Sequence, residues 1–378
     1  MALDLALFGE KVRRLREAFE EEVDDLARAT GIAPVRLRSF EAGQDSPTGD
    51  EVLILADHFK EDFRFFISNE QRTVLERTEK LFRAHSAELS KADRWSIQEF
   101  LFLCDNEAFL MTELGRSSRV SFTPQVGGTY FRQHGWDAAH QLRQALRYRE
   151  RDVPSDLFHD VRQLGFHVFR RQLENSNLSG LFIDHPSAGP CLLINYSEDV
   201  YRQRFTAAHE AAHAIFDRDD EFVVSFSKWT KDNLREVRAD AFASAYLVPP
   251  QLLQDVEVSS LTESRLLDLA DQLRVSVRAL VMAFIRDKHI PKEDWEKYKH
   301  VRIPRGAKHD PELPASLTGA QRARKLTLLK RGLSTAYVDL CFEAFQRNVV
   351  TRAKLAEMLL MDETELGEID ALFRNGPR

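Results

Sequence analysis

The feature that most constrains this chain is a helical pattern near its middle, with two histidines four residues apart and a glutamate after the first. These residues are His209, Glu210 and His213. On a helix both imidazoles lie on one face, one turn apart, so they can bind a single zinc ion, and the glutamate can reach a water held by that metal. The pattern predicts a zinc-dependent hydrolase in which Glu210 is the catalytic residue.

The residues that flank this motif favour a buried helix. Most of them are small or apolar, namely Ala207, Ala208, Ala211, Ala212, Ala214 and Ile215. A helix packed against a sheet needs such a surface, and burying two histidines and a glutamate there would be costly without a partner such as a metal ion. The alternative interpretation is a helix with two exposed histidines.

The cysteines limit which ligands a metal could find. The chain has three of them, Cys104, Cys191 and Cys341, which lie far apart and form no CxxC pair. Neither a disulfide framework nor a thiolate zinc site can be built from them. We therefore expect a Zn2+ site made of histidine and carboxylate groups.

A third protein ligand is needed, because a catalytic zinc site uses three side chains and leaves one position open for water. The segment from Leu234 to Pro249 has helical spacing and ends at a pair of prolines. Glu236 and Asp240 share one face of this helix, so one can bind zinc while the other accepts a hydrogen bond from the free nitrogen of a histidine ligand. We assign Glu236 as the ligand and Asp240 as the orienting residue. In one alternative Asp240 is the ligand, and in the other both residues merely belong to a solvated face of the helix.

Two stretches of the sequence resemble the ImmA/IrrE family of zinc peptidases, and the similarity spans about residues 150–290. They are RQRFTAAHEAAHAIF (202–216) and EVRADAFASAYLVPP (236–250). The positions that match the family pattern are Arg202, Arg204, Phe205, Thr206, Ala208, His209, Glu210, His213, Glu236, Ala239, Asp240, Phe242, Ala243 and Pro249. The resemblance implies a zincin-like, gluzincin-like metalloendopeptidase in which His209, His213 and Glu236 bind zinc and Glu210 is catalytic.

Two positions depart from the family pattern. Ala212 stands where the family usually has glycine, and Arg238 stands where a second acidic residue is common. We expect Ala212 to keep the helix tightly packed. We expect Arg238 to alter the substrate cleft and to remove a rival metal ligand.

Near the N-terminus, the segment from Asp25 to Gly43 has the spacing of a helix, a tight turn at Gly31 and a second helix. It resembles the XRE (Cro/repressor) helix-turn-helix family at Leu26, Ala27, Gly31, Leu37, Phe40, Glu41 and Gly43. The recognition helix would span about 34–42. Side chains placed to contact bases or phosphates of double-stranded DNA are Arg36, Arg38, Ser39 and Gln44.

The charge of this N-terminal segment argues against a simple DNA reader. Residues 1–60 hold 8 Lys and Arg against 13 Asp and Glu, and the whole chain carries a net charge of −7. Phosphate contacts need positive charge. Val23 also replaces the polar residue that the family usually has before the second helix. The alternative is a helix-turn-helix used for protein contact, whereas dimerisation could restore DNA affinity through two weak contacts.

The organisation along the chain predicts an α+β, predominantly helical protein. An N-terminal all-α helix-turn-helix domain is expected at 1–68, a helical connector and linker at 69–135, a zinc metallopeptidase domain at 136–300, and a C-terminal helical region at 301–378. Three strands are expected in the metallopeptidase domain, at GFHVFRR, LSGLFID and CLLIN. No membrane span or signal peptide is evident, which points to the cytoplasm.

These observations favour a zinc endopeptidase fused to a helix-turn-helix regulator. By resemblance, its substrate is a transcriptional repressor or related regulatory protein in a stress, prophage or defence response. One alternative is a DNA-binding transcription regulator whose zinc domain is a sensor. A glutamate suited to catalysis argues against it, because a structural site needs only ligands. Another alternative is an enzyme whose acidic N-terminal domain docks a protein substrate. A homodimer is a candidate assembly under any of these interpretations.

Overall fold

The computed structural model describes residues 3–69, 73–116, 120–175, 177–220, 222–226, 233–257 and 261–367. The described residues form many helices and one small sheet, which confirms the predicted α+β, predominantly helical class. They divide into two compact units, residues 1–105 with 173–175 and residues 106–172 with 176–378. The division lies within the segment expected to be a connector. None of the described helices has the length and apolar character needed to cross a membrane.

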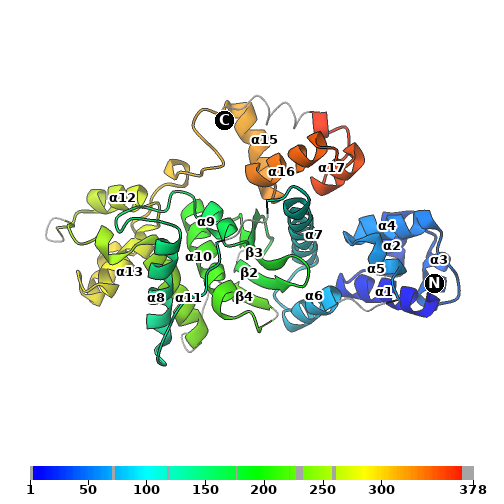
Figure 1. Ribbon diagram of the computed structural model, residues 1–378, viewed down its shortest axis with the longest axis horizontal. Helices are drawn as coiled ribbons and strands as arrows, with labels where there is room; N and C mark the ends of the chain where they lie inside the picture. The colour runs from blue at the N-terminus through cyan, green and yellow to red at the C-terminus, as the bar shows by residue number, and fades with distance from the viewer. Residues whose placement is uncertain are drawn as a thin grey trace. The chain divides into compact units, whose positions relative to one another are not determined.

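The described part of the first unit is helical (Figure 1). Its helices are α1 (Leu5–Ala18), α2 (Val23–Thr30), α3 (Pro34–Glu41), α4 (Gly49–Phe59), α5 (Phe63–Ile67), α6 (Thr73–Ala84) and the first part of α7 (Lys91–Glu113). The apolar residues that recur at helical spacing in this part of the sequence are at most 6% exposed, and they are Phe8, Val12, Leu15, Phe19, Leu26, Leu37, Phe40, Val52, Leu55 and Phe59. The apolar periodicity of the sequence therefore identifies the core of this unit correctly.

A glycine turn joins α2 to α3, as the sequence predicts. Gly31 has φ +72°, a left-handed conformation that glycine adopts without steric cost, and it ends α2. A second glycine allows α1 to approach α3, because a Cβ on Gly9 would lie 1.9 Å from the carbonyl oxygen of Phe40. A tight turn thus joins α2 to α3, and a glycine on α1 lets α3 pack closely against α1.

The second unit is built around a four-stranded sheet with the order β1-β3-β2-β4. The strands are β1 (His167–Arg171), β2 (Leu178–His185), β3 (Gly189–Asn195) and β4 (Phe222–Phe226). β1 pairs with β3 in parallel, whereas β2 is antiparallel to both β3 and β4. The first three strands were predicted, and β4, which forms an edge of the sheet, was not. A β-bulge interrupts the pairing of β2 with β4 between Leu178 and Gly180.

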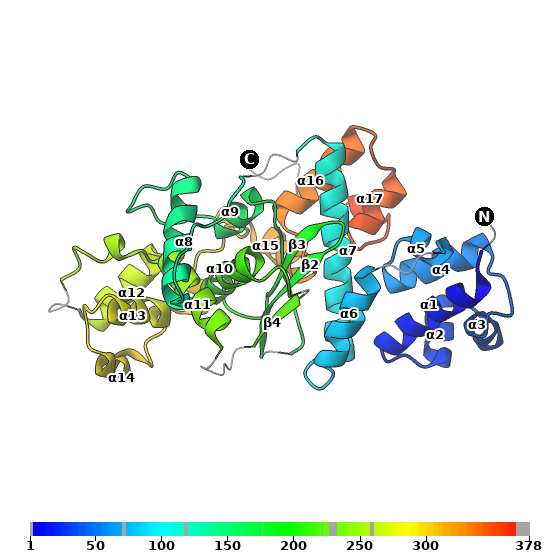
Figure 2. The same ribbon diagram turned by 60° about the horizontal axis from the view of Figure 1, so that its bottom comes forward.

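The helix that carries the histidine motif, α10 (Val200–Phe216), lies against β2 and β3 (Figures 1 and 2). The side chain of Asp199 caps it by accepting hydrogen bonds from the backbone of Tyr201 and Arg202. Its five alanines from 207 to 214 are at most 1% exposed. These small side chains let the helix lie close to the sheet, so the motif residues are buried, as the sequence predicts.

Two further helices complete the framework behind α10. They are α11 (Leu234–Leu247), which packs against α10, and α8 (Phe131–Ala145), which packs against α11. Asn233 caps the start of α11, and the helix ends at Leu247, two residues before Pro249. The contact between α8 and α11 is close, because a Cβ on Gly135 would lie 2.3 Å from the carbonyl oxygen of Arg238. This glycine fixes the backbone of α11 near the motif.

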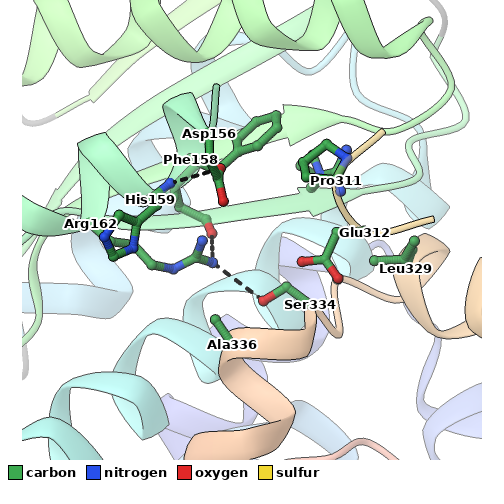
Figure 3. Close-up of a pocket in the computed structure, with 12 residues that line it drawn as sticks. Asp156, Phe158, His159, Arg162, Pro311, Glu312, Leu329, Ser334 and Ala336 are labelled. Carbon is green, nitrogen blue, oxygen red and sulfur yellow. Dashed lines mark hydrogen bonds between the residues drawn. The ribbon is translucent and has the colours of Figure 1, made fainter. Parts of the chain in front are cut away.

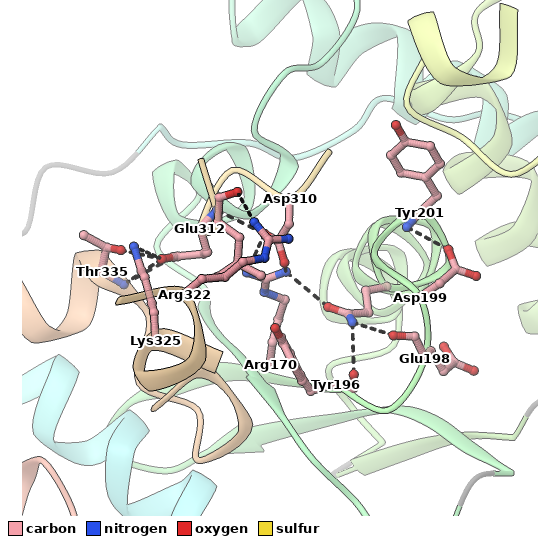
Figure 4. A network of polar contacts seen from close by, with 12 residues as sticks. Arg170, Tyr196, Glu198, Asp199, Tyr201, Asp310, Glu312, Arg322, Lys325 and Thr335 are labelled. Atoms are coloured by element: carbon pink, nitrogen blue, oxygen red, sulfur yellow. Dashed lines mark hydrogen bonds and ion pairs between the residues drawn. The ribbon is translucent and has the colours of Figure 1, made fainter. Parts of the chain in front are cut away.

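The remaining elements of the second unit surround this framework. They are α9 (Leu157–Gln163), α12 (Glu263–Gln272), α13 (Val277–Arg286), α14 (Trp295–Tyr298), α15 (Gly319–Lys330), α16 (Thr335–Gln346) and α17 (Arg352–Met358), with 3-10 turns η1 (Pro250–Leu252), η3 (Lys292–Asp294) and η4 (Arg305–Ala307). Between η4 and α15, residues 308–312 form a strap that contacts the start of α10 and β1, and Figure 4 shows Asp310 of this strap beside Arg170. Lys308 contacts Asp199 at 2.8 Å, and Asp310 forms two hydrogen bonds of 3.0 and 3.1 Å with Arg170 on β1.

Candidate metal centre

Three side chains from two helices converge at the centre of the second unit. His209 and His213 lie one turn apart on α10, and Glu236 lies in the first turn of α11. The Nε2 atoms of the two histidines are 3.1 Å apart. A carboxylate oxygen of Glu236 lies 3.2 Å from Nε2 of His209, and the other lies 3.5 Å from Nε2 of His213.

These spacings fit one zinc ion. Ligands about 2.0–2.1 Å from zinc at the corners of a tetrahedron lie about 3.3 Å from one another. The observed separations of 3.1 to 3.5 Å are close to this value. Among the described residues, His209, His213 and Glu236 form a group that could hold a metal ion, because their ligand atoms all lie within 4.8 Å of one another. Two imidazoles and a carboxylate are a donor set typical of catalytic zinc.

Glu210 lies beside this cluster and is fully buried, with the side chains of His209, His213 and Ser225 nearby. The residue is 0% exposed, and neither of its carboxylate oxygens has a hydrogen-bond partner among the described residues. Burial raises the pKa of Glu210, against the opposing influence of His209 and His213. A buried carboxylate without a partner is costly. A water held by a metal would give it the missing hydrogen bond, so the residue fits a metal-assisted hydrolytic site.

A glycine on β2 makes the space for this carboxylate. A Cβ on Gly180 would lie 2.7 Å from Oε1 of Glu210, 3.0 Å from its Cγ and 2.6 Å from Cγ2 of Thr206. These distances are shorter than the 3.5–4.0 Å of an ordinary contact between carbon atoms. Only a residue without a side chain allows α10 to approach β2 at this point. The β-bulge of β2 lies at the same place.

Each histidine has a carboxylate on its other ring nitrogen. Nδ1 of His209 lies 3.1 Å from Asp240, as expected for the orienting role assigned to Asp240. Nδ1 of His213 lies 2.8 Å from Asp217, which follows the end of α10 and was not singled out from the sequence. The available signal was the spacing, because a residue four positions after His213 falls on the same helical face.

Arg238 contacts Asp217 and lies away from solvent. Its Nη2 donates a hydrogen bond to Oδ1 of Asp217, and the residue is 8% exposed. The expectation that Arg238 alters the substrate cleft finds no support in these contacts. The other departure from the family pattern, Ala212, is 1% exposed and belongs to the tightly packed surface of α10.

The protein groups of the cluster also attract one another electrostatically. Burial would lower the pKa of His209, but hydrogen bonds with Asp240 and Glu236 outweigh it and raise the pKa to about 10. Burial would raise the pKa of Glu236, but hydrogen bonds from His209 and His213 lower it to about 2. A metal cation would take the place of the histidine protons, because only the neutral imidazole can bind it.

A separate cavity of about 70 Å³ lies between α9, β1 and the C-terminal segment of the second unit (Figure 3). Arg162 at its edge donates hydrogen bonds to the carbonyl oxygen of Val168 and to the side chain of Ser334. None of the three candidate zinc ligands, nor Glu210, lines this cavity. It is therefore distinct from the candidate metal centre.

The side chains expected to contact DNA are largely engaged within the first unit. Arg36 forms two hydrogen bonds of 2.9 and 3.0 Å with Glu51 and lies 3.2 Å from Asp45. Arg38 lies 3.2 Å from Asp24, and Ser39 donates a hydrogen bond to Asp45.

The fourth of these residues, Gln44, is exposed. The hydrogen bond with Arg36 lowers the pKa of Glu51 to about 2, so this carboxylate stays charged. The positive charge of the expected recognition helix is therefore neutralised by nearby carboxylates.

The comparison with protein families supports the metallopeptidase interpretation for part of the chain. Residues 161–284 match the Peptidase M78 family, described as the IrrE N-terminal-like domain. The match includes His209, Glu210, His213 and Glu236 and supports a metallopeptidase-type domain of the ImmA/IrrE family. It does not extend to the helix-turn-helix segment. No curated protein matches the chain.

Proposed function

We propose that this protein is a zinc-dependent endopeptidase, in which His209, His213 and Glu236 bind zinc and Glu210 is the catalytic base. The observation that carries the proposal is the buried carboxylate of Glu210 beside three converging ligand atoms. A sensor or structural site would have no use for a buried carboxylate without hydrogen-bond partners. The match of residues 161–284 to a peptidase family supports the same conclusion.

When bound, zinc would polarise the scissile carbonyl group and lower the pKa of the attacking water. Glu210 would take a proton from this water and pass it to the amine that leaves when the peptide bond breaks. Its buried position keeps the carboxylate a strong proton acceptor, because burial favours its neutral form. Asp240 and Asp217 would keep the Nε2 atoms of the histidines free to bind the metal.

The substrate we propose is a transcriptional repressor or a related regulatory protein in a stress, prophage or defence response. This proposal rests on the resemblance to the ImmA/IrrE family. The first unit would bring the peptidase to its target. The ion pairs of Arg36 and Arg38 favour a protein partner over DNA, because phosphate groups would have to displace Glu51, Asp45 and Asp24 from these arginines.

The test is a comparison of zinc content and cleavage in matched variants. Purified wild-type protein should hold about one zinc per chain, and His209→Ala should lose it. Glu210→Gln should retain zinc but lose cleavage of a co-expressed repressor substrate by a factor of about 100 or more. Glu263→Gln, which changes an exposed glutamate of α12, is the control and should cleave normally. Unchanged cleavage by Glu210→Gln would refute its assignment as the base.

A further inference from the structure

The end of α10 and the facing side of α11 are joined by two buried charged residues. Asp217, just after α10, accepts a hydrogen bond of 2.8 Å from Nδ1 of His213. The side chain of Asp217 is 4% exposed and that of His213 is 0% exposed, so little water competes for this contact. A proton on Nδ1 leaves the lone pair of Nε2 free, and Nε2 is the atom that faces the metal cluster.

Arg238 fixes the other oxygen of the same carboxylate. Its guanidinium group donates to Oδ1 of Asp217 and lies over two aromatic rings, 4.4 Å from the centroid of Phe216 and 5.3 Å from that of Phe131. A planar guanidinium held on aromatic faces has few alternative orientations. The close contact of Gly135 with the carbonyl oxygen of Arg238 also holds the backbone of this residue.

These contacts form a closed path between the ligands of the two helices. Starting from His213 on α10, it runs through Asp217 to Arg238 on α11, and Glu236 lies two residues before Arg238 on the same helix. A shift of α11 relative to α10 would break the bond between Asp217 and Arg238. The path therefore sets both the orientation of His213 and its separation from Glu236.

We propose that Asp217 and Arg238 are positioning residues that preorganise the metal centre, Asp217 by fixing the ring and tautomer of His213 and Arg238 by fixing Asp217. The inference rests on the proposed zinc site. It also ranks the two carboxylates that contact the histidines. The side chain of Asp240 is 51% exposed, against 4% for Asp217, so water can replace the contact of Asp240 with His209 more easily than that of Asp217 with His213.

The test measures zinc affinity by competition with a chromophoric chelator, together with the visible absorption spectrum of the cobalt-substituted protein. Asp217→Asn should weaken zinc binding about 10- to 100-fold and change the cobalt spectrum, whereas Asp240→Asn should have a smaller effect. The control Asp220→Asn removes an acidic residue that pairs with Arg235 and has no contact with a candidate zinc ligand. It should bind zinc within twofold of wild type.

A matched pair of arginines tests the second positioning residue. Arg235 and Arg238 both lie on α11 within 4.0 Å of Oδ1 of Asp217, but their side chains are 50% and 9% exposed. Arg238→Ala should weaken zinc binding at least fivefold, Arg238→Lys should restore part of the loss, and Arg235→Ala should change it less than twofold. If Asp217→Asn does not fold, as judged by circular dichroism, the three arginine variants decide the outcome.

The results separate two kinds of failure. If the wild-type protein binds no zinc, the proposed function is refuted. If the wild-type protein binds zinc and both Asp217→Asn and Arg238→Ala bind it within twofold of wild type, the metal centre stands and the positioning role is overturned. A larger loss in Asp240→Asn than in Asp217→Asn would also contradict the proposal.

Discussion

The substitution Gly180→Ala tests whether the close approach of α10 to β2 positions the carboxylate of Glu210, the proposed catalytic base. The added Cβ would lie 2.7 Å from Oε1 of Glu210 and 2.6 Å from Cγ2 of Thr206. Ordinary contact distances are about 3.5 Å or more, so one of the two elements must move by roughly 0.8 Å, or Glu210 must change its rotamer. We expect the unfolding free energy to fall by about 1–3 kcal/mol, as in other overpacked cores.

The effect on function should be selective. A displacement of about 1 Å at a catalytic group can reduce the rate about 100-fold. Zinc binding should change much less, because His209, His213 and Glu236 meet where α10 faces α11. The assays are cleavage of the co-expressed regulator, zinc affinity and thermal unfolding, all measured on the same protein preparation.

Gly306→Ala is a suitable control for this experiment. No atom lies within 4 Å of the position that its Cβ would occupy, and the residue belongs to the same unit. We expect it to cleave normally. If Gly180→Ala cleaves at the wild-type rate with an unchanged melting temperature, the close approach of β2 does not position Glu210, and a glycine is not required at position 180.

Three further predictions concern protonation, buried charge and the first unit. The pKa of His209, raised to about 10 by Asp240 and Glu236 against desolvation, favours the protonated ring. Zinc binding near pH 7 should therefore release protons, and zinc affinity should rise with pH toward 10. Calorimetry in buffers of different ionisation enthalpy measures the proton release, and zinc binding without it would contradict the prediction. In the zinc-free protein the stabilisation by this histidine should be complete below about pH 6.5 and be lost as the pH rises through 10. Asp310→Ala should lower the unfolding free energy by about 3–5 kcal/mol, because it leaves the buried Arg170 without its carboxylate partner. The control Asp255→Ala, which breaks the exposed ion pair with Arg151, should lower it by less than about 1 kcal/mol in the same denaturation experiment. Finally, the wild-type protein should not shift double-stranded DNA in a gel at low salt; a shift that Arg36→Ala weakens would assign DNA rather than protein as the partner of the first unit.

The elements around the motif were predictable because local patterns define them. The spacing of His209 and His213, the alanines between and around them, and the capping residue Asp199 all favour one buried helix, and the structure has it at 200–216. The cluster with Glu236 followed from helical spacing together with the number of ligands that zinc requires. The core of the first unit followed from apolar periodicity in the same way.

The features that were missed depend on how distant segments pack. The bond of Asp217 to Arg238 requires the end of α10 to face α11, which no local pattern specifies. β4 is different, because its residues FVVSF are mostly β-branched or aromatic and do carry a local strand signal, which was overlooked; only its pairing with β2, about 40 residues earlier in the chain, depends on packing. The ion pairs of Arg36 with Glu51 and Asp45 likewise depend on the approach of α4 and its preceding loop to α3. The acidic composition of the segment indicated the imbalance of charge but not its partners.

The strap at 308–312 has a consequence for the order in which the protein is made. The start of α10 is held by Lys308 at Asp199, and β1 is held by Asp310 at Arg170, across 140 residues of sequence. At a synthesis rate of about 5–20 residues per second, the roughly 70 residues between Glu236 and this strap take on the order of 4–15 s to make. During that time the nascent chain contains every candidate zinc ligand and Glu210, but it lacks the contacts of Lys308 with Asp199 and of Asp310 with Arg170. The candidate metal centre thus gains the support of the strap only after most of the chain has been made.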